Sequence, residues 1–561
     1  MHAEATQPGG LVRIADYLVE RLRQHDVGHV FGVPGDYVLT LFDHLEGSAL
    51  TVVNTCDEQG AGFAADAYAR MRGLGVVCVT YGVGGLKVAN TTAQAFAEQS
   101  PVIVISGAPS LAEQADGQLL HHVINNYDNQ QRIFERLTVA TAVLDDPDLA
   151  CREIDRVIDA TLVNQQPDYL EIPRDMTLVE VARPQQPLPV WHGPQSDGPA
   201  LEAAVNDAVS LLRAAKQPVA FLGVEAVRLG LLPAALLLIE GSSIPTAVTP
   251  LDKSAISEQH PCFIGVYGGA MSRRPVLDYV ESADCLLLLG ALLTDLNLGG
   301  NTAHLRPERF IHATRHQVRI GYRTYDRVRL EDFVSALAEV KLPDFSLISK
   351  PSMPASTAGQ PRPETPMTVA RLFDRLGAFL SDTTVVIADP GDATFGALDL
   401  PVRQDHEFLA NAFYASLGFA VPGSIGAQLA APDRRPLVLV GDGAFQMTGM
   451  ELSTSLRYGL NPVVVVLNNG GYLTEWLMAD GAFNDVLPWN YARLMDVFGA
   501  GRSFVVRTED DLEAALAEAG SSSDLCLIDV HLASDDASPA LRRLAEGLGS
   551  KTGKAAATQA D

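Results

Sequence analysis

The sequence predicts an α/β protein built from three doubly wound domains with mainly parallel sheets. Apolar runs of strand length alternate with runs of helical length along most of the chain. Polar signatures follow the strands at their carboxyl ends, where open parallel sheets bind ligands. At 561 residues the chain is also too long for one core, since domains average ~150 residues.

Two proline-rich stretches, residues 183–199 and 341–367, divide the chain. Proline cannot donate to a sheet ladder or continue a helix, so both stretches are expected to be extended connections. The three domains are therefore predicted at residues 10–182, 200–340 and 366–531.

The first domain alternates helical and strand patterns. Helices are expected at 14–25 and near 61–71, and strands at 29–32, 76–81 and 102–107. Each helix that joins two parallel strands must cross over the sheet, so this order predicts doubly wound topology.

The middle domain has strand patterns at 219–223, 285–289 and 310–313. No Gly-x-Gly-x-x-Gly opens a helix there, so its glycine loops favour a structural role, with a bound nucleotide or effector as the alternative. The leucine-rich run 229–240 is too short for a membrane span and predicts a buried helix.

The third domain has strands near 385–389, 437–440, 463–467 and 525–530. Gly441-Asp442-Gly443 follows one strand, and Asn469-Gly470-Gly471 follows the next. Gly441 and Gly443 allow close approach of an anion, and the helix that follows offers unpaired N–H groups. Asp442 and Asn469 add hard oxygen ligands suited to magnesium. A diphosphate bridged to the protein by magnesium is the simplest ligand.

Charge and composition exclude several classes of function. A net charge of −27 argues against nucleic-acid and anionic-membrane partners. Six scattered cysteines without a Cys-x-x-Cys indicate neither a zinc site nor a disulfide framework. The first ten residues have no apolar signal core, and a cytoplasmic location is expected.

With 26 residues between Asp442 and Asn469, the two halves of the third-domain motif match the thiamin diphosphate signature. From about Val12 to about Asp529 the chain resembles the thiamin diphosphate-dependent 2-oxoacid decarboxylases, which include pyruvate, indolepyruvate and phenylpyruvate decarboxylases. The resemblance rests on the loop at residues 31–36, the segment 56–70, the histidine pair 121–122, the segment 414–418, and the motif that leads into residues 471–475.

The resemblance implies thiamin diphosphate and Mg²⁺ as cofactors and a role for each matching residue. Glu58 is expected to share a proton with the aminopyrimidine ring, and Asp36, His121, His122 and Glu475 to be the acids and bases of the reaction. The carbonyl of Ala415 would accept from the 4′-amino group, and Leu417 would wedge between the two cofactor rings. The expected metal ligands are Asp442, Asn469 and Gly471, and further cofactor contacts are expected at Thr80, Asp392, Gly441, Gly443, Ala444, Gly471 and Tyr472.

The expected substrate is an aromatic or aliphatic 2-oxoacid that loses carbon dioxide to give an aldehyde. Thr394 aligns with a position where some pyruvate-selective relatives have a tryptophan, so a smaller residue leaves room for branched or aromatic substrates, with pyruvate not excluded. Phe395, Thr474 and Met478 would line the same cavity. In the family that this chain resembles, the glutamate that corresponds to Glu58 and the diphosphate site come from different subunits. At least a homodimer is therefore expected, with a homotetramer as the usual further step.

Two other functions stay open. A carboligase of acetolactate synthase type uses the same cofactor and often holds FAD in its middle domain, but it generally lacks the histidine pair. A non-catalytic paralogue that only binds the cofactor or partners is the other alternative. The presence of all five proton-handling residues, Asp36, Glu58, His121, His122 and Glu475, counts against it.

Overall fold

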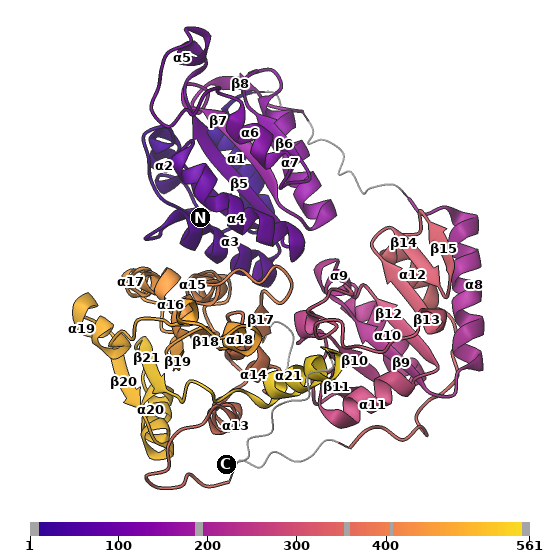
Figure 1. Ribbon diagram of the computed structural model, residues 1–561. Helices are drawn as coiled ribbons and strands as arrows, with labels where there is room; N and C mark the ends of the chain where they lie inside the picture. Colours follow the sequence, from indigo (N-terminus) through magenta and orange to yellow (C-terminus); the bar gives the residue numbers. More distant parts are fainter. Residues whose placement is uncertain (1–9, 186–194, 353–358, 404–407, 553–561) are drawn as a thin grey trace. The chain divides into compact units, whose positions relative to one another are not determined.

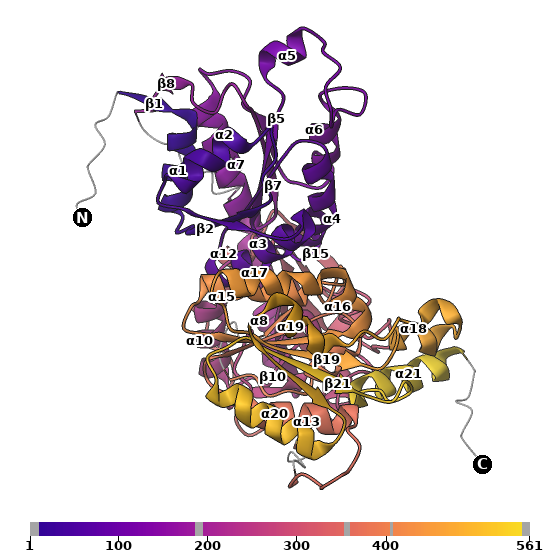
Figure 2. The same ribbon diagram turned by 90° about the vertical axis from the view of Figure 1, so that its left-hand side faces the viewer.

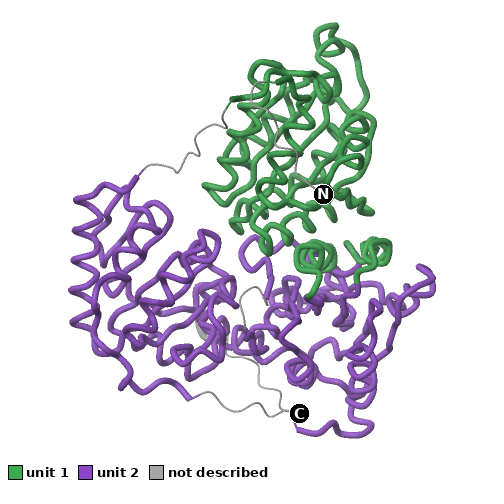
Figure 3. Tube along the Cα trace, turned by 180° about the vertical axis from the view of Figure 1, so that it is seen from behind, with its two compact units in different colours: residues 1–193, 421–433, 448–460 green, residues 194–420, 434–447, 461–561 purple. Residues whose placement is uncertain are grey.

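The computed structural model describes residues 10–185, 195–352, 359–403 and 408–552. It confirms the predicted α/β fold with mainly parallel sheets (Figure 1). The chain forms two compact units: unit 1 contains residues 1–193, 421–433 and 448–460, and unit 2 contains residues 194–420, 434–447 and 461–561 (Figure 3). The predicted domain boundaries at 10–182, 200–340 and 366–531 stay a prediction.

Unit 1 contains a sheet of six parallel strands. In spatial order these are β3 (Thr51–Asn54), β2 (His29–Gly32), β4 (Gly75–Val79), β5 (Val102–Ala108), β7 (Asp168–Pro173) and β6 (Thr141–Val143). The chain runs from β2 to β3 on one side and then crosses to β4 on the other, so the strand order reverses between β2 and β4. Loops at such a point leave a crevice in which ligands bind.

Helices cover both faces of this sheet, which is why its strand β4 is wholly apolar and β5 is nearly so. One face packs against α1 (Ile14–Gln24), α2 (Leu39–Glu46) and α7 (Ala150–Asn164), and the other against α3 (Glu58–Arg72), α4 (Val83–Ala97) and α6 (Asn129–Phe134). Figure 2 shows β5 and β7 with α1, α2 and α7 on one side and α4 and α6 on the other. A short helix α5 (Leu111–Ala115) follows β5, and β1 (Leu11–Arg13) pairs with β8 (Glu180–Ala182).

The middle part of the chain forms a seven-stranded sheet in unit 2. Its order is β11 (Phe263–Val266), β10 (Thr246–Val248), β9 (Pro218–Leu222), β12 (Cys285–Leu289), β13 (Phe310–Thr314), β14 (Gln317–Ile320) and β15 (Arg323–Asp326), the last two antiparallel. Around it lie α8 (Gly198–Ala214), α9 (Val224–Arg228), α10 (Leu232–Ser242), η1 (Pro250–Asp252), α11 (Arg274–Ser282), η2 (Pro307–Arg309) and α12 (Leu330–Ala338).

The strand order of the middle sheet reverses between β9 and β12, but the loops there bond directly to each other. Gly223 N donates to Leu289 O at 2.9 Å, and Glu225 N donates to Gly290 O at 3.1 Å. A Cβ on Gly223 would lie 2.1 Å from Ala291 N. This close backbone contact supports the structural role that was predicted for the middle glycine loops.

The last part of the chain repeats the strand order of unit 1 in a six-stranded parallel sheet. Its order is β17 (Phe408–Ala410), β16 (Thr384–Ala388), β18 (Arg435–Gly441), β19 (Val463–Asn468), β21 (Cys526–His531) and β20 (Arg502–Val506). The helices of this part of unit 2 are α13 (Val369–Phe379), α14 (Asp392–Ala397), α16 (Asp442–Thr448), α18 (Leu473–Met478), η4 (Ala482–Asn484), η5 (Tyr491–Arg493), α19 (Leu494–Phe498), α20 (Glu509–Ser521) and α21 (Pro539–Thr552). Three further helices of the same stretch of chain, α15 (Ala420–Ala430), η3 (Gly449–Glu451) and α17 (Leu452–Arg457), belong to unit 1.

The predicted strands match the observed ones within one or two residues, because uninterrupted apolar runs mark strands that are buried on both faces. The helix predicted near 61–71 begins earlier, at Glu58, because the Asp57 side chain caps it by accepting from Gln59 N at 2.8 Å. The prediction of a buried helix at residues 229–240 was only partly correct, because α10 begins at Leu232 and the Leu237 side chain is exposed. Within the described ranges, no helix combines the length and apolar character needed to cross a membrane.

Candidate active site

The two halves of the third-domain motif meet at one edge of the sheet. β18 and β19 are neighbouring parallel strands with Gly441 opposite Leu467, so Asp442 and Asn469 both follow carboxyl ends. The Asp442 carboxylate accepts from Gly443 N at 2.8 Å and from Gly470 N at 2.7 Å. The strand order reverses next to β18, between β16 and β18, which places this motif at a ligand crevice.

Asp442 is almost fully buried, and burial raises the pKa of its carboxyl to about 6. Its described hydrogen-bond partners are backbone N–H groups, so no side-chain cation among the described residues is seen to neutralise it. A buried carboxylate with this set of partners is suited to a divalent cation.

Of the two glycines that were predicted to allow close approach of an anion, only Gly441 faces open space, whereas Gly443 is packed against a side chain. A Cβ on Gly441 would meet open space, which leaves room for an approaching group. A Cβ on Gly443 would lie 2.4 Å from the Tyr472 ring, and one on Gly471 would lie 2.4 Å from the Trp476 ring. Tyr472 and Gly471 are thus packed against the Gly-Asp-Gly turn and α18, and Ala444 is buried in the first turn of α16.

The loop after β19 is tied down by a short antiparallel contact. Tyr472 N donates to Asn484 O at 2.9 Å, and Val486 N donates to Gly470 O at 2.9 Å. Asn469 Oδ1 accepts from Gly471 N at 3.3 Å. Glu475 lies in the first turn of α18 and is exposed.

The segment that was predicted to support the cofactor is a strained loop between β17 and α15. Ala415 has φ 58°, a left-handed conformation that costs a non-glycine residue free energy and is typical of functional sites. Leu417 is half-buried, and Asn411 Nδ2 donates to Ser416 O at 2.7 Å.

Asp389, at the end of β16, anchors this loop. Its Oδ1 accepts from Gly418 N at 2.9 Å and its Oδ2 from Ala420 N at 2.7 Å. Asp389 is fully buried, and burial raises the pKa of its carboxyl to about 7. The sequence pattern marked Asp389 only as the last residue of a strand and gave no sign of this role. A polar residue directly after an apolar strand was the available signal.

Asp389→Ala should destabilise the protein by about 1–3 kcal/mol for each backbone N–H that loses its acceptor. The folded protein holds the Asp389 proton more tightly than the unfolded chain, because burial raises the pKa of this carboxyl to about 7. The stability from this proton is full below pH ~4 and is lost as the pH rises through about 7. Urea unfolding at several pH values should therefore show that the difference in free energy of unfolding between Asp389→Ala and the unmodified protein becomes smaller as the pH rises. Asp382→Ala, at the exposed amino end of β16, is the matched control; an equal loss of stability there would contradict the anchoring role.

The residues that were predicted to line the substrate cavity lie on α14 and α18. Thr394 is buried, and its hydroxyl donates to Asp389 O at 2.7 Å. Phe395 packs into an apolar cluster with Leu473 and Trp476, while Thr474 is half-buried and Met478 exposed.

Asp392 begins α14 and accepts from Ser538 N at 2.8 Å. Burial raises the pKa of its carboxyl to about 6, and its Oδ1 is buried without a hydrogen-bond partner among the described residues. Its predicted cofactor contact stays a prediction.

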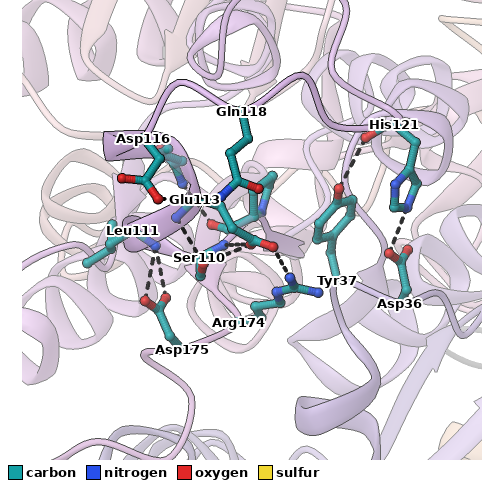
Figure 4. Close-up of polar contacts among 12 residues, drawn as sticks. Asp36, Tyr37, Ser110, Leu111, Glu113, Asp116, Gln118, His121, Arg174 and Asp175 are labelled. Carbon is teal, nitrogen blue, oxygen red and sulfur yellow. Dashed lines mark hydrogen bonds and ion pairs between the residues drawn. The ribbon is translucent and has the colours of Figure 1, made fainter.

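Unit 1 brings together three of the predicted proton-handling residues. His121 Nε2 lies 2.7 Å from Asp36 Oδ2 (Figure 4). The ring centroids of His121 and His122 are 4.6 Å apart. One ligand atom from each of Asp36, His121 and His122 lies within 4.8 Å of the others. A carboxylate bonded to one imidazole and beside a second can hold and move protons between these groups.

Tyr37 holds the histidine loop in place. Its ring stacks on His121 with centroids 5.1 Å apart, and its hydroxyl donates to His121 O at 3.2 Å. The base of the loop is a capping box in which Ser110 and Glu113 bond to each other, and Glu113 also pairs with Arg174 (Figure 4). His122 has φ 67°, so the loop turns sharply between the two histidines. Tyr37 follows directly on Asp36, but no local pattern showed that it would contact His121, 84 residues away.

Glu58 is the first residue of α3 and is buried. Glu451 stabilises the turn before it, since its carboxylate accepts from the backbone N–H groups of Cys56 at 3.2 Å and Asp57 at 3.1 Å. Burial raises the pKa of Glu451. Thr80, at the end of β4, has a buried hydroxyl without a hydrogen-bond partner among the described residues. Sequence reasoning missed Glu451, because no local pattern connects it with a residue almost 400 positions earlier.

Residues 12–133, 205–339 and 389–530 match the models of the N-terminal TPP binding, central and C-terminal TPP binding domains of thiamine pyrophosphate enzymes. The chain is 37% identical over 515 residues to indole-3-pyruvate decarboxylase from Azospirillum brasilense, with 91% of this chain and 93% of the relative covered. It is 34% identical over 545 residues to pyruvate decarboxylase 1 from Pisum sativum, with 94% and 91% covered. It is also 34% identical over 502 residues to a pyruvate decarboxylase from Candida glabrata, with 87% and 89% covered.

The chain therefore belongs to the thiamin diphosphate (thiamine pyrophosphate) enzymes. Within them it is a member of the 2-oxoacid decarboxylases, which confirms the predicted family, fold and reaction class. Each unit by itself has residues that fit the cofactor. In unit 2, Asp442 offers a buried carboxylate to a cation and Gly441 leaves open space. In unit 1, the buried hydroxyl of Thr80 has no hydrogen-bond partner among the described residues.

Proposed function

We propose that this protein decarboxylates a range of 2-oxoacids, aromatic and branched as well as pyruvate, with Mg²⁺ holding the cofactor's diphosphate at Asp442, Asn469 and Gly471. The observation that supports this most is the Asp442 carboxylate, which is buried and spans the two halves of the motif through Gly443 N and Gly470 N. When bound, thiamin diphosphate would supply a thiazolium ring, which can take up the electron pair left behind as carbon dioxide departs.

The chain's own residues position groups and move protons. Glu58 exchanges a proton with the pyrimidine ring nitrogen, and the carbonyl of Ala415 accepts from the amino group next to it. Asp36 and His121 are hydrogen-bonded to each other. This pair donates a proton to the substrate carbon that has lost carbon dioxide, and the product leaves as an aldehyde. His122 and Glu475 complete the set of acids and bases. Leu417, Thr80, Asp392, Gly441, Gly443, Ala444 and Tyr472 form the remaining cofactor contacts.

The first experiment is a substrate panel. The purified protein is incubated with thiamin diphosphate and Mg²⁺, and aldehyde and carbon dioxide are measured from pyruvate, 2-oxoisovalerate, phenylpyruvate, indolepyruvate and benzoylformate. Aldehyde in proportion to carbon dioxide supports the proposal, and the ranking names the substrate. Carbon dioxide with an acetohydroxy acid in place of aldehyde would move the protein to the carboligases.

Thr394→Trp should shift the preference toward small substrates. Thr394 is buried on α14, and we place it with Phe395, Thr474 and Met478 around the substrate side chain. An indole in its place removes the volume that an aromatic substrate needs. The ratio of kcat/KM for phenylpyruvate to that for pyruvate should fall about tenfold or more, as for other changes of pocket volume. Thr394→Val keeps the volume, so its ratio should match that of the unmodified protein; an equal fall would contradict the assignment.

We also propose that the protein is at least a homodimer, with a homotetramer as the usual assembly of such enzymes, and that it acts in the cytoplasm. Large apolar side chains are exposed on both units: Leu119 and Ile124 on unit 1, and Leu477, Phe483 and Leu487 on unit 2. Exposed apolar groups of this size are typical of protein–protein interfaces. The six cysteines are free thiols, as expected in a reducing compartment. Light scattering of the purified protein tests the assembly.

A further inference from the structure

Lys87 of α4 lies between two adjacent carboxylates at the start of α3. Its Nζ donates to Glu58 Oε2 at 2.9 Å and also to Asp57 Oδ2. The Glu58 side chain is only 11% exposed, whereas those of Lys87 and Asp57 are 49% and 44% exposed. One ammonium group is thus shared by a buried and a half-exposed carboxylate.

The backbone leaves little freedom to Glu58 but much to Lys87. Glu58 begins α3, and its Oε1 lies 3.4 Å from where a Cβ on Gly84 would be, so the first turn of α4 packs directly on it. Asp57 is fixed as the helix cap by the bond from Gln59 N to its Oδ1, which leaves Oδ2 for Lys87. The long Lys87 side chain can leave Glu58 and stay on Asp57 without moving either helix.

The role proposed above requires a Glu58 oxygen to hydrogen-bond to a ring nitrogen. Lys87 already occupies Oε2 at 2.9 Å, and Oε1 faces the first turn of α4. A ring nitrogen that reaches this carboxylate therefore competes with Lys87 for it.

We infer that Lys87 is a positioning residue that switches between two acceptors: it holds Glu58 in the cofactor-free protein and moves onto Asp57 alone when thiamin diphosphate binds. Asp57 is the acceptor that makes this release possible. This inference rests on the proposed role of Glu58. It predicts effects of opposite sign at Lys87 and Asp57, which a merely structural ion pair would not produce.

The test is the dissociation constant of thiamin diphosphate, measured by calorimetry on the cofactor-free full-length protein in excess Mg²⁺. Lys87→Met removes the ammonium group that must be displaced, so the cofactor should bind about two- to fivefold more tightly, the range of exposed ion pairs. Asp57→Asn removes the second acceptor but retains a good helix cap, so the cofactor should bind more weakly by a similar factor. In the Lys87→Met background, Asp57→Asn should have no further effect.

The matched control is Arg132→Met, which removes an exposed cation of α6 that pairs with Asp128. This variant should leave the dissociation constant of thiamin diphosphate unchanged. Equal or weaker binding by Lys87→Met, or additive effects in the double variant, would overturn the switch. A separate readout tests its foundation: exchange of the thiazolium C2 proton in Glu58→Gln. If exchange stops there while both single variants bind like the unmodified protein, the switch fails and the role of Glu58 stands. If exchange continues, the role of Glu58 fails first.

Discussion

Glu58→Gln should stop exchange of the thiazolium C2 proton while leaving thiamin diphosphate bound. The amide has nearly the same shape as the carboxyl and can still hydrogen-bond to the ring nitrogen, but it cannot exchange a proton with it. Glu58 is buried at the start of α3, so the missing proton transfer is not readily replaced by water. A positioned acid or base of this kind contributes ~100- to 10,000-fold, so kcat should fall by that factor.

The measurement is deuterium exchange at C2 of the bound cofactor, followed by acid quench and NMR. Glu153→Gln makes the same chemical change in the first turn of another helix, α7, where Glu153 pairs with Arg156 at 2.6 Å. This variant should exchange at the normal rate. Normal exchange in Glu58→Gln would show that another group activates the cofactor.

The second large effect is expected for Asp442→Asn, which should weaken the binding of Mg²⁺ and of thiamin diphosphate together. The carboxylate charge is what a buried site needs to hold a divalent cation, and an amide supplies only a neutral oxygen. Loss of one charged interaction corresponds to about 10- to 100-fold in affinity. Because we propose that the metal bridges the diphosphate to the protein, the two losses should have similar size.

Cofactor affinity measured at several Mg²⁺ concentrations tests this coupling. Asp433→Asn is the matched control, since Asp433 is exposed just before the amino end of β18, whereas Asp442 follows the carboxyl end of the same strand. Cofactor affinity that stays unchanged in Asp442→Asn would count against the metal assignment, even if the protein remained folded.

The sequence by itself determined the elements and the reaction class. Strands such as β12 and β19 are short apolar runs whose burial on both faces leaves little ambiguity, and helix starts such as Asp57 have local capping chemistry. The turns Gly441-Asp442-Gly443 and Asn469-Gly470-Gly471 were recognisable because their spacing is that of one strand-helix-strand unit. Each of these signals depends on residues within about 30 positions of one another.

Only the tertiary structure decided which distant groups meet. Asp36 and His121 are 85 positions apart, and they bond because β2 and β5 lie in one sheet with their carboxyl ends at the same edge. Asp389 was seen only as the end of a strand, yet it anchors the loop after β17. Lys87 was not singled out, because its pairing with Glu58 depends on how α4 packs against α3. Such contacts depend on strand order and helix packing, which local periodicity does not specify, so the sequence identified the chemistry and the fold decided its partners.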